Sequence, residues 1–496
     1  MLTRLAIKGF KNLVDAEVRF GPLTCIAGAN GIGKSNLFDA IQFLGLLADK
    51  SFIEAASEVR GGGTLTNLFT IGGDNRMHLS CDVLIPEQGV DDFNQPAVAQ
   101  NTFVTYEIEL FLTDDRSTSI PKISLEREVL SYVTKAETRQ RLGFPHAKEW
   151  RDSVARGTGR RSSRTFIRTE ADANTGDTVI HLQSDRMRAA DKDRRGGGRP
   201  AAFLASRLPR TVLSSAHNAE EARTAVLLRR EMRQWRQLQL EPSALRRSDD
   251  FQSPARIDPS GAHVPASLYR LATMAEEQPA DVYQQIANRV AQLVEGVRSI
   301  RVDRDEGRKL LQLLLQENGQ IELPASALSD GTLRFLALAV MERDPEETGV
   351  LCLEEPENGI HPRRIEAMLG LLEDMAVDPM IAVDESNPLR QVIFSTHSPL
   401  VVGSLRPEHV VFAQPDRRKL DGKMSESVGF SAVGDSWRTK VGAEPVSLGF
   451  ILSYLGQPAP VAGDRGAGIQ KPDNVRAMAE RQLALFDRQQ DCDTGS

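Results

Sequence analysis

The sequence predicts an α/β fold of two lobes, one from each end of the chain, with a mainly helical insertion between them. Three observations support this prediction. Near the N-terminus, an apolar strand runs into a glycine-rich loop and then into a helix with apolar residues at helical spacing. Farther along the chain, two more apolar strands end in acidic and hydroxyl-bearing side chains. The residues between these blocks are strongly basic in part and show no sustained heptad pattern.

These patterns divide the chain into four segments. We expect a first lobe at residues 1–133, the insertion at 134–320, a second lobe at 321–415 and a C-terminal extension at 416–496. Within the insertion, Ala219–Gln239 predicts a helix. The insertion is too short for a long coiled-coil arm, so we expect a compact body with one flexible basic stretch.

Composition and length are those of an ordinary globular protein. Of the 496 residues, 40% are hydrophobic and 26% charged, which allows two or three domain-sized cores. The four cysteines lie far apart without a Cys-x-x-Cys pair, which argues against a zinc knuckle and a disulfide framework. No apolar stretch approaches the ~18 residues of a membrane span, and the start of the chain does not resemble a leader. We therefore expect a cytoplasmic protein without a membrane partner.

The first lobe begins with alternating apolar and polar residues. Residues 2–8 and 16–20 predict antiparallel strands joined by a turn around Gly9–Asn12. A third strand, Leu23–Ala27, leads into a glycine-rich loop, and Asn36–Ala48 then has the spacing of a helix. This order of strand, loop and helix sets the context for the motif in the loop.

The loop from Gly28 to Ser35 has the pattern Gly-x-x-x-x-Gly-Lys-Ser, which is typical of a phosphate-binding loop. Glycines let backbone N–H groups turn toward a phosphate, and the following helix presents its N-terminus to the same anion. Lys34 is expected to reach the β- and γ-phosphates, and the Ser35 hydroxyl to bind Mg²⁺. The expected ligands are therefore ATP and Mg²⁺. The residues predicted to contact them are Asn30, Gly31, Ile32, Gly33, Lys34, Ser35 and Asn36.

The insertion carries a local excess of positive charge. Residues 134–210 hold 18 lysines and arginines against 9 acidic residues, whereas the whole chain has a net charge of -7. Such a cluster can attract nucleic-acid phosphates or a partner protein. It is equally consistent with a solvated, flexible segment that includes the run Gly196–Pro200.

Three more motifs follow in the second lobe. Leu328–Arg334 places a Ser-Asp-Gly cluster before an apolar helix, a pattern that alone indicates an N-cap and a turn. The apolar strand Val350–Leu353 ends in two acids, which suits Mg²⁺ binding and water activation at the edge of a parallel sheet. The strand Gln391–Ser395 ends in the sequence Thr-His-Ser-Pro.

Together, the four motifs resemble those of ABC ATPases of the RecF/SMC/OLD group, and most closely the bacterial AAA_21-type ATP-binding proteins. The resemblance covers residues 1–130 and 320–415. It includes Tyr106–Leu110 and the segment from Ile123 to Glu126, which look like antiparallel strands of the first lobe in that family. It implies a P-loop NTPase fold: a two-lobed ABC ATPase head with a mixed sheet and an antiparallel lobe.

The resemblance also implies nucleotide contacts that the motif rules do not give. Ser329, Asp330 and Gly331 match the signature motif, which binds the γ-phosphate held by the opposite subunit. Lys11 and Asn12 match a Phe-Lys-Asn turn that touches nucleotide in this branch. Both sets are therefore expected to contribute to nucleotide binding.

Three residues take catalytic or metal-binding roles by the same resemblance. Glu354 matches the metal-side residue of the Walker B segment, where the family usually has Asp, and Glu355 matches the general base. His397 matches the switch histidine that contacts the γ-phosphate. A glutamine equivalent to the family's Q-loop residue is not identified in residues 60–110.

The implied function is ATP binding and hydrolysis to ADP and phosphate in a head-to-head homodimer or higher homo-oligomer. OLD proteins also carry a TOPRIM nuclease domain, but residues 398–496 lack strand-borne acids of that kind; Asp491 and Asp493 lie in a polar tail. Related stand-alone ATPases act beside a separately encoded nuclease or toxin in anti-phage defence. We therefore expect an effector protein as partner.

Two alternatives remain. A RecF-like repair or recombination ATPase would bind DNA directly, and residues 134–210 would supply the contact surface. A transporter's nucleotide-binding subunit is disfavoured, because the first lobe begins in the Phe-Lys-Asn style and the insertion has no transporter counterpart.

Overall fold

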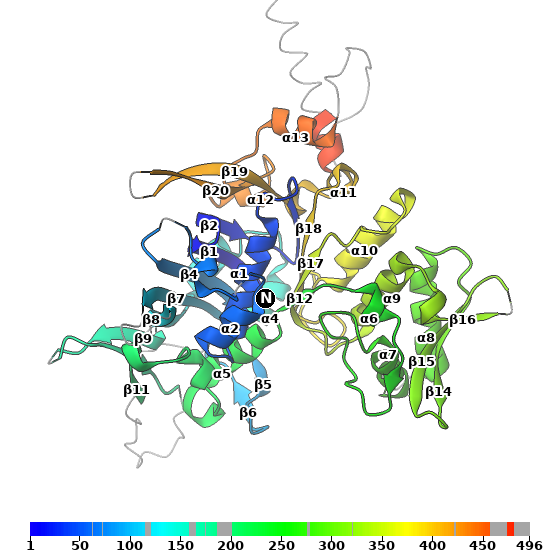
Figure 1. Cartoon of the computed structure of the whole chain (residues 1–496), viewed down its shortest axis with the longest axis horizontal. Helices are drawn as coiled ribbons and strands as arrows, with labels where there is room; N and C mark the ends of the chain where they lie inside the picture. Colours follow the sequence, from blue (N-terminus) through cyan, green and yellow to red (C-terminus); the bar gives the residue numbers. More distant parts are fainter. Residues whose placement is uncertain are drawn as a thin grey trace, which may run out of the picture.

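The computed structural model places the predicted strands and helices in a two-lobed α/β arrangement (Figure 1). It describes residues 1–61, 63–71, 73–114, 121–157, 165–173, 175–185, 201–274, 278–319, 321–420, 423–456 and 474–480. Part of the predicted basic stretch, with the run Gly196–Pro200, lies outside these residues, as do Asp491 and Asp493. No helix in the described ranges is long and apolar enough to span a membrane.

One sheet is almost entirely parallel and carries the predicted phosphate loop. In spatial order its strands are β12 (Arg236–Leu238), β17 (Gly349–Glu354), β18 (Arg390–Thr396), β3 (Leu23–Ala27), β19 (Val410–Leu420) and β20 (Lys423–Ala432). Only β20 runs antiparallel to its neighbour. Thr396 is opposite Ala27 and Ser395 is opposite Glu354, so the carboxyl ends of three strands meet at one edge. Such an edge is where ligands bind in parallel α/β sheets.

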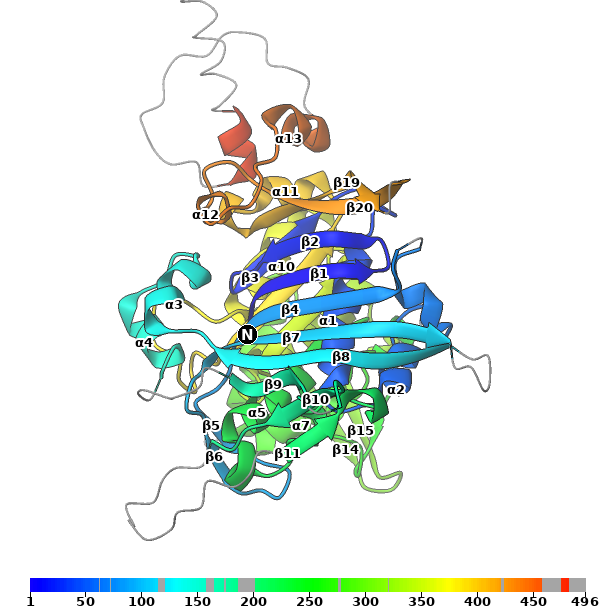
Figure 2. The same ribbon diagram turned by 90° about the vertical axis from the view of Figure 1, so that its left-hand side faces the viewer.

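A second, antiparallel sheet forms most of the first lobe. Its strands are, in spatial order, β11 (Ala201–Leu204), β10 (Thr178–Leu182), β9 (Thr165–Ala171), β8 (Pro121–Tyr132), β7 (Phe103–Asp114), β4 (Arg76–Leu84), β1 (Leu2–Phe10) and β2 (Leu13–Arg19). Figure 2 shows β1, β4, β7 and β8 side by side as long ribbons. Helices α1 (Lys34–Leu47) and α5 (Ala219–Arg233) share a hydrophobic core with this sheet. That core reaches Ile26, Cys352 and Ile393 on one face of the parallel sheet.

The second lobe is mostly helical and covers the other face of the parallel sheet. Its helices are α6 (Pro242–Leu245), α7 (Val264–Met274), α8 (Pro279–Ala291), α9 (Asp330–Arg343) and α10 (Ile365–Met375). A small sheet packs against them, with strands β13 (Asp249–Asp250), β14 (Ser299–Asp305), β15 (Leu310–Gln316) and β16 (Glu322–Pro324). Cys25, Leu351 and Phe394 join this core, so the parallel sheet lies between two separate hydrophobic cores.

Smaller elements complete the described fold. They are α2 (Phe52–Glu58), β5 (Gln88–Val90), β6 (Pro96–Val98), α3 (Lys135–Leu142), α4 (Lys148–Val154), α11 (Pro399–Ser404), α12 (Trp437–Lys440) and α13 (Leu448–Leu455). The pair α3 and α4 packs in a third apolar cluster with Trp437, Val377 and Leu389. Figure 2 shows this pair at one end of the long strands β7 and β8.

The segment expected as one insertion, residues 134–320, is divided among other parts of the fold. Strands β9 to β11 extend the antiparallel sheet, β12 joins the parallel sheet, and only the part from α6 onward belongs to the second lobe. The helix predicted over Ala219–Gln239 ends earlier, because α5 stops at Arg233 and β12 begins at Arg236. Gln237 and Leu238 are buried against β17, and this parallel pairing overrides helix propensity. The expected C-terminal boundary at residue 416 falls inside β19.

Candidate nucleotide site

The phosphate loop connects β3 to α1 at the shared edge of the parallel sheet. Gly31 and Gly33 adopt positive φ angles of 77° and 115°, which glycine allows without strain. A Cβ on Gly33 would also lie 2.5 Å from the Asn12 amide nitrogen. Both the φ angle and the close approach of Asn12 therefore favour glycine at this position. Lys34 is the first residue of α1, and its backbone therefore belongs to the free N–H end of a helix.

The Lys34 ammonium lies inside the loop. Its Nζ donates to the carbonyl oxygens of Gly28, at 2.7 Å, and Ala29, at 2.9 Å. Burial lowers the pKa of Lys34, whereas the charges of Glu355 and Glu354 oppose that shift. The loop thus holds a positive charge beside the N-terminus of α1, as phosphate binding requires.

Ser35 and Glu354 meet across the sheet edge, as a shared metal site requires. The Ser35 hydroxyl donates to Glu354 Oε2 at 3.0 Å, and the Gln237 amide donates to Glu354 Oε1 at 2.8 Å. A hydroxyl and a carboxylate are hard oxygen ligands, and Mg²⁺ is often held by only one or two such groups together with substrate phosphates. The residues present therefore fit the metal that the sequence predicts.

Gln237 and Arg60 are functional candidates that the sequence did not reveal. Arg60 donates to Asp39 on α1, at 3.1 Å, and to Glu354, at 3.3 Å, and so links the helix to the end of β17. Asp39 is fully buried. A fully buried acid on the apolar face of α1 is the signal that could have indicated a buried cationic partner.

Lys11 and Asn12 lie against the loop but hold different parts of it. Lys11 Nζ donates to Asp39 Oδ2 at 2.6 Å, which attaches the turn after β1 to α1. Asn12 Nδ2 donates to the Ile32 carbonyl at 3.2 Å, and its Oδ1 accepts from the Asn36 amide at 2.7 Å. Asn12 and Asn36 therefore fix the loop conformation through side-chain hydrogen bonds.

Glu355 and His397 form a hydrogen-bonded pair beside the loop. His397 Nδ1 donates to Glu355 Oε1 at 2.7 Å, and Asn358 donates to Glu355 Oε2 at 2.9 Å. Glu355 has a φ of 48°, which is costly for a residue with a side chain and is typical of functional sites. Burial raises the pKa of Glu355, but the hydrogen bonds from Asn358 and His397 outweigh it, so the net pKa lies below its ordinary value. The group is a carboxylate at neutral pH and can accept a proton.

Glu357 follows on the same loop and points into the sheet edge. The Thr396 hydroxyl donates to its Oε1, and burial raises the pKa of this carboxyl group. Its Oε2 is buried and has no hydrogen-bond partner within the described part of the chain. Glu357 thus connects the loop after β17 to the last residue of β18.

The signature segment lies at the N-terminus of α9. Ser329 caps α9, and its hydroxyl accepts from the Thr332 N–H at 3.2 Å. Asp330 pairs with Arg246, and a Cβ on Gly331 would lie 2.5 Å from the Gly359 carbonyl oxygen. The structure thus brings Lys34, Ser35, Glu354, Glu355 and His397 together, whereas the contacts of Ser329–Gly331 lie within the second lobe.

The N-terminus of α9 is tied to the loop after β17. Arg334 donates to the Asn358 carbonyl at 2.9 Å and to the Leu240 carbonyl at 3.2 Å. Asn358 in turn donates to Glu355. The signature helix and the expected general base therefore share one loop.

The chain is similar to several known proteins. A protein-family model described as "AAA domain, putative AbiEii toxin, Type IV TA system" matches residues 23–403. Two curated proteins named DNA replication and repair protein RecF match locally. The one from Magnetococcus marinus is 56% identical over 48 residues, or 10% of this chain and 12% of that protein. The one from Phocaeicola vulgatus is 47% identical over 45 residues, or 9% of this chain and 12% of that protein.

The chain therefore spans about an eighth of the length of these RecF relatives. Among solved structures, an SMC head bound to the C-winged helix domain of ScpA is 13% identical, with a TM-score of 0.42. That match covers 87% of this chain and 98% of the solved one.

Proposed function

The chain belongs to the matched AAA domain family and is an ABC-class ATPase of the RecF/SMC-like type, and we propose that it hydrolyses ATP between two head-to-head copies. The observation that carries this proposal is the hydrogen bond from Ser35 to Glu354. It joins the helix after the phosphate loop to the strand that bears the acids, 319 residues later in the chain. Two oxygen ligands and a charged loop thereby face one ligand position.

Each residue has a role that follows from its position. Lys34 and the loop N–H groups would hold the β- and γ-phosphates, and Ser35 and Glu354 would hold Mg²⁺. Bound Mg²⁺ would neutralise charge on the phosphates during transfer. Glu355 orients the attacking water and accepts its proton, and His397 fixes the carboxylate through Nδ1. Catalysis by this set is positioning and charge stabilisation.

The second subunit completes the site through Ser329, Asp330 and Gly331. Ser329 lies at the start of α9, a helix of 14 residues whose N-terminus can face an anion. Because the same residues of each copy face the partner's phosphate loop, such a dimer has two identical composite sites. ATP would then hold the two heads together, and hydrolysis would release them.

The Glu355→Gln variant tests this function. It keeps the phosphate loop intact but removes the proton acceptor, so ATP turnover should fall by about 10²–10⁴-fold. The variant should accumulate as an ATP-bound dimer in size-exclusion chromatography, whereas Lys34→Ala should bind ATP poorly and stay monomeric with ATP. A Lys34→Ala protein with normal ATP affinity would contradict the proposal.

The cellular role that we propose is regulation of a separately encoded nuclease or toxin in anti-phage defence. The family description, which names a toxin and a type IV toxin–antitoxin system, supports this role. Phage challenge of cells that carry the gene with its neighbours provides the test. Protection should require Lys34 and Glu355, and equal protection by the Lys34→Ala variant would contradict the role.

The local identity to RecF favours a second candidate, a DNA-binding repair or recombination ATPase. In that case the isolated chain should bind duplex or gapped DNA with strong salt dependence. Cells without the gene should be sensitive to DNA damage and not to phage. The two candidates thus differ in a measurable phenotype.

A further inference from the structure

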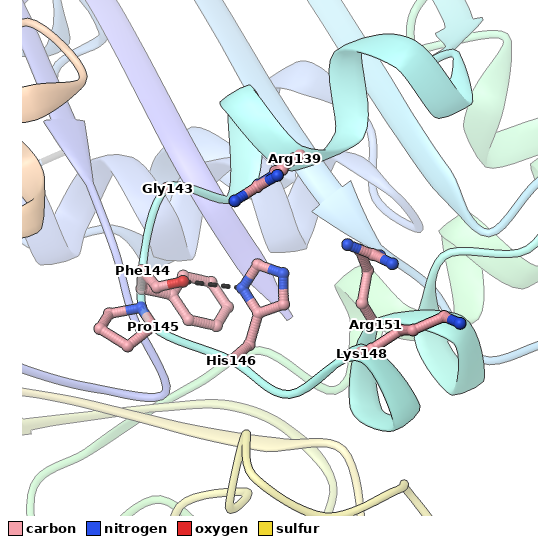
Figure 3. A pocket seen from close by; sticks show the side chains of 7 residues that line it. All are labelled: Arg139, Gly143, Phe144, Pro145, His146, Lys148 and Arg151. Carbon is pink, nitrogen blue, oxygen red and sulfur yellow. Dashed lines mark hydrogen bonds between the residues drawn. The ribbon is translucent and has the colours of Figure 1, made fainter.

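A pocket of about 440 Å³ lies between α3 and α4 of the first lobe, and basic side chains dominate its lining (Figure 3). Arg139 reaches it from α3, Arg151 from α4, and His146 lies between them on the connecting loop. Lys148 also lines the pocket, and none of the lining residues is acidic. This site is separate from the residues that form the nucleotide site.

The pocket is held in shape by a rigid aromatic base. Phe144 packs edge-on against Trp150, with ring centroids 5.4 Å apart, and against Trp437, at 5.9 Å. Gly143 has a φ of 68°, and a Cβ there would lie 3.0 Å from the Trp437 ring. The Ala147 N–H donates to the Pro379 carbonyl at 2.9 Å, which anchors the loop to the segment before β18. A ligand would therefore meet a largely pre-formed site.

The positive charges of the pocket are poorly neutralised. Within the described residues, Arg139 and Lys148 make no ion pair, and the carboxylate paired with Arg151 is the exposed Asp152, at 3.4 Å. Burial lowers the pKa of His146, and the charges of Arg151 and Arg139 lower it further, although the hydrogen bond to the Phe144 carbonyl opposes this. Because Nδ1 donates to that carbonyl, the proton gained on titration would sit on Nε2. An anion bound beside both arginines would offset their positive charge and would therefore raise the pKa of His146.

We propose that this pocket binds a phosphate monoester, either of a free mononucleotide or at the 5′ end of an oligonucleotide. Arginine forks match phosphate oxygens in geometry and charge. A monoester carries about −1.5 to −2 charge at pH 7, which suits a pocket lined by several cations better than the single charge of a backbone diester. The pocket volume lies in the range that holds small ligands and not a duplex.

The test compares oligonucleotides that differ only at the 5′ end. Fluorescence anisotropy with a 3′-labelled single strand should show about tenfold or tighter binding of the 5′-phosphorylated form than of the 5′-hydroxyl form. The double variant Arg139→Gln/Arg151→Gln should abolish this preference. The matched control is Arg207→Gln/Arg210→Gln, which removes the same charge from exposed positions of the same lobe and should keep the preference.

A second probe distinguishes the two sources of the phosphate. AMP is titrated into the Lys34→Ala protein, so that binding at the phosphate loop does not contribute. The binding should be lost when Arg139→Gln and Arg151→Gln are added to this variant. Binding of AMP without a 5′-phosphate preference assigns a free nucleotide, whereas the preference without AMP binding assigns a strand end. Neither signal, or equal losses in pocket and control variants, would overturn the proposal.

The pKa of His146 provides a readout that is specific to this pocket. The chain has eight histidines, and isotope-labelled histidine with a His146→Gln spectrum for assignment gives its titration. Saturating inorganic phosphate should raise the pKa of His146 in the otherwise native protein and in Lys34→Ala. This inference does not rest on the proposed ATPase cycle, so its failure would leave that cycle untouched.

Discussion

Glu354 gathers more partners than any motif predicts. Its Oε2 accepts from Ser35, while its Oε1 accepts from Gln237 and, at 3.3 Å, from Arg60. The family usually has the shorter Asp at this position, and the extra methylene of Glu354 accompanies direct contact with the hydroxyl on α1. These three hydrogen-bond donors fix the orientation of the Glu354 carboxylate through direct contacts. The orientation of this metal ligand therefore depends on residues beyond the acidic motif.

We predict that Gln237→Ala weakens Mg²⁺ binding rather than ATP binding. Removing a partner that orients a metal ligand typically costs about 10–100-fold in metal affinity. The Mg²⁺ concentration for half-maximal ATP turnover should therefore rise about tenfold or more. Gln239→Ala is the matched control, because Gln239 is exposed two residues later and should leave the Mg²⁺ dependence unchanged. An unchanged Mg²⁺ requirement in Gln237→Ala would separate this amide from the metal site.

At the residue scale, the sequence indicated the parts of the site that lie in contiguous motifs. Lys34 and Ser35 stand in a loop whose spacing is imposed by phosphate geometry, and Glu355 and His397 stand at strand ends. Gln237 and Arg60 have no such local pattern. They reach Glu354 only because β12 pairs with β17 and because Asp39 holds Arg60 on α1. Tertiary pairing, which no short motif encodes, brings them into the site.

Helix α9 packs tightly against the loop after β17, and Gly331 is the residue of the helix at this contact. A Cβ at Gly331 would lie 2.5 Å from the Gly359 carbonyl oxygen, which is backbone and cannot rotate away. We predict that Gly331→Ala pushes α9 from this loop and destabilises the fold by about 1–3 kcal/mol. It should also reduce ATP-dependent dimerisation, because Ser329 moves with the helix. Urea unfolding and size-exclusion chromatography measure the two effects.

Gly370 in α10 is the control for that substitution. It is a helical glycine with open space at the Cβ position, so Gly370→Ala should be neutral or stabilising by about 0.5–1 kcal/mol. If both variants had the same unfolding free energy, close packing at Gly331 would not be the reason for its glycine.

A buried carboxyl group couples two other elements of the first lobe. Glu128 on β8 accepts from the backbone N–H groups of Val212 and Leu213 and from the Tyr106 hydroxyl. Burial raises the pKa of Glu128 to about 7, although these donors oppose the shift. The folded state therefore keeps a proton that the unfolded chain releases at its ordinary, lower pKa. Stability from this group is present below the unfolded pKa and is lost as pH rises through 7.

We predict that native stability relative to Glu128→Gln falls as pH increases from 4.5 to 8. The shift from 4.5 to about 7 corresponds to about 3 kcal/mol. Urea unfolding of both proteins across this range measures the difference. Glu126→Gln on the same strand, which removes an exposed partner of Arg76, should run parallel to the native profile. If the unfolding free energies of Glu128→Gln and native protein also changed with pH in parallel, Glu128 would not hold an extra proton in the folded state.

At the element scale, the sequence predicted strands that alternate and apolar strands that lead into a motif, and it missed several strands between them. The pair β1–β2 was predicted because apolar and polar residues alternate along both strands, whereas parts of β7 and β8 were expected from the family resemblance. β12 has three residues and follows α5 after a two-residue connection, which leaves no period to detect. β9 to β11 were hidden because the basic stretch surrounding them suggested a separate body. Their edge position in a larger sheet is a property of the folded chain.

At the scale of the whole molecule, the two hydrophobic cores hold the parallel sheet that carries the site. The parallel sheet is shared between them, with Ile393 in one core and Phe394 in the other. The two-lobed α/β class follows from motif order, since the phosphate loop and the acids must converge on one sheet. Nothing in a single chain specifies which copy supplies the signature residues to which loop. That question requires a test on mixed dimers.

We predict that two inactive variants restore ATP turnover when mixed. Lys34→Ala removes the phosphate contact, and Ser329→Arg blocks the signature surface, so each homodimer lacks both composite sites. A mixed dimer pairs the intact loop of one copy with the intact Ser329 of the other and regains one site. A mixed dimer has one of the two native sites, so turnover should appear only in the mixture and should not exceed about half of the native rate.

The control mixture combines Lys34→Ala with Glu355→Gln. Both residues belong to the same half of the site, as the proximity of Glu355 and the lysine-bearing loop indicates, so every site in the mixed dimer has a defect and turnover should stay low. If Lys34→Ala and Ser329→Arg also failed to complement while each variant remained folded, the signature residues would act within their own chain or not at all. Recovery only in the first mixture requires that the phosphate loop of one copy and α9 of another enclose the same ATP.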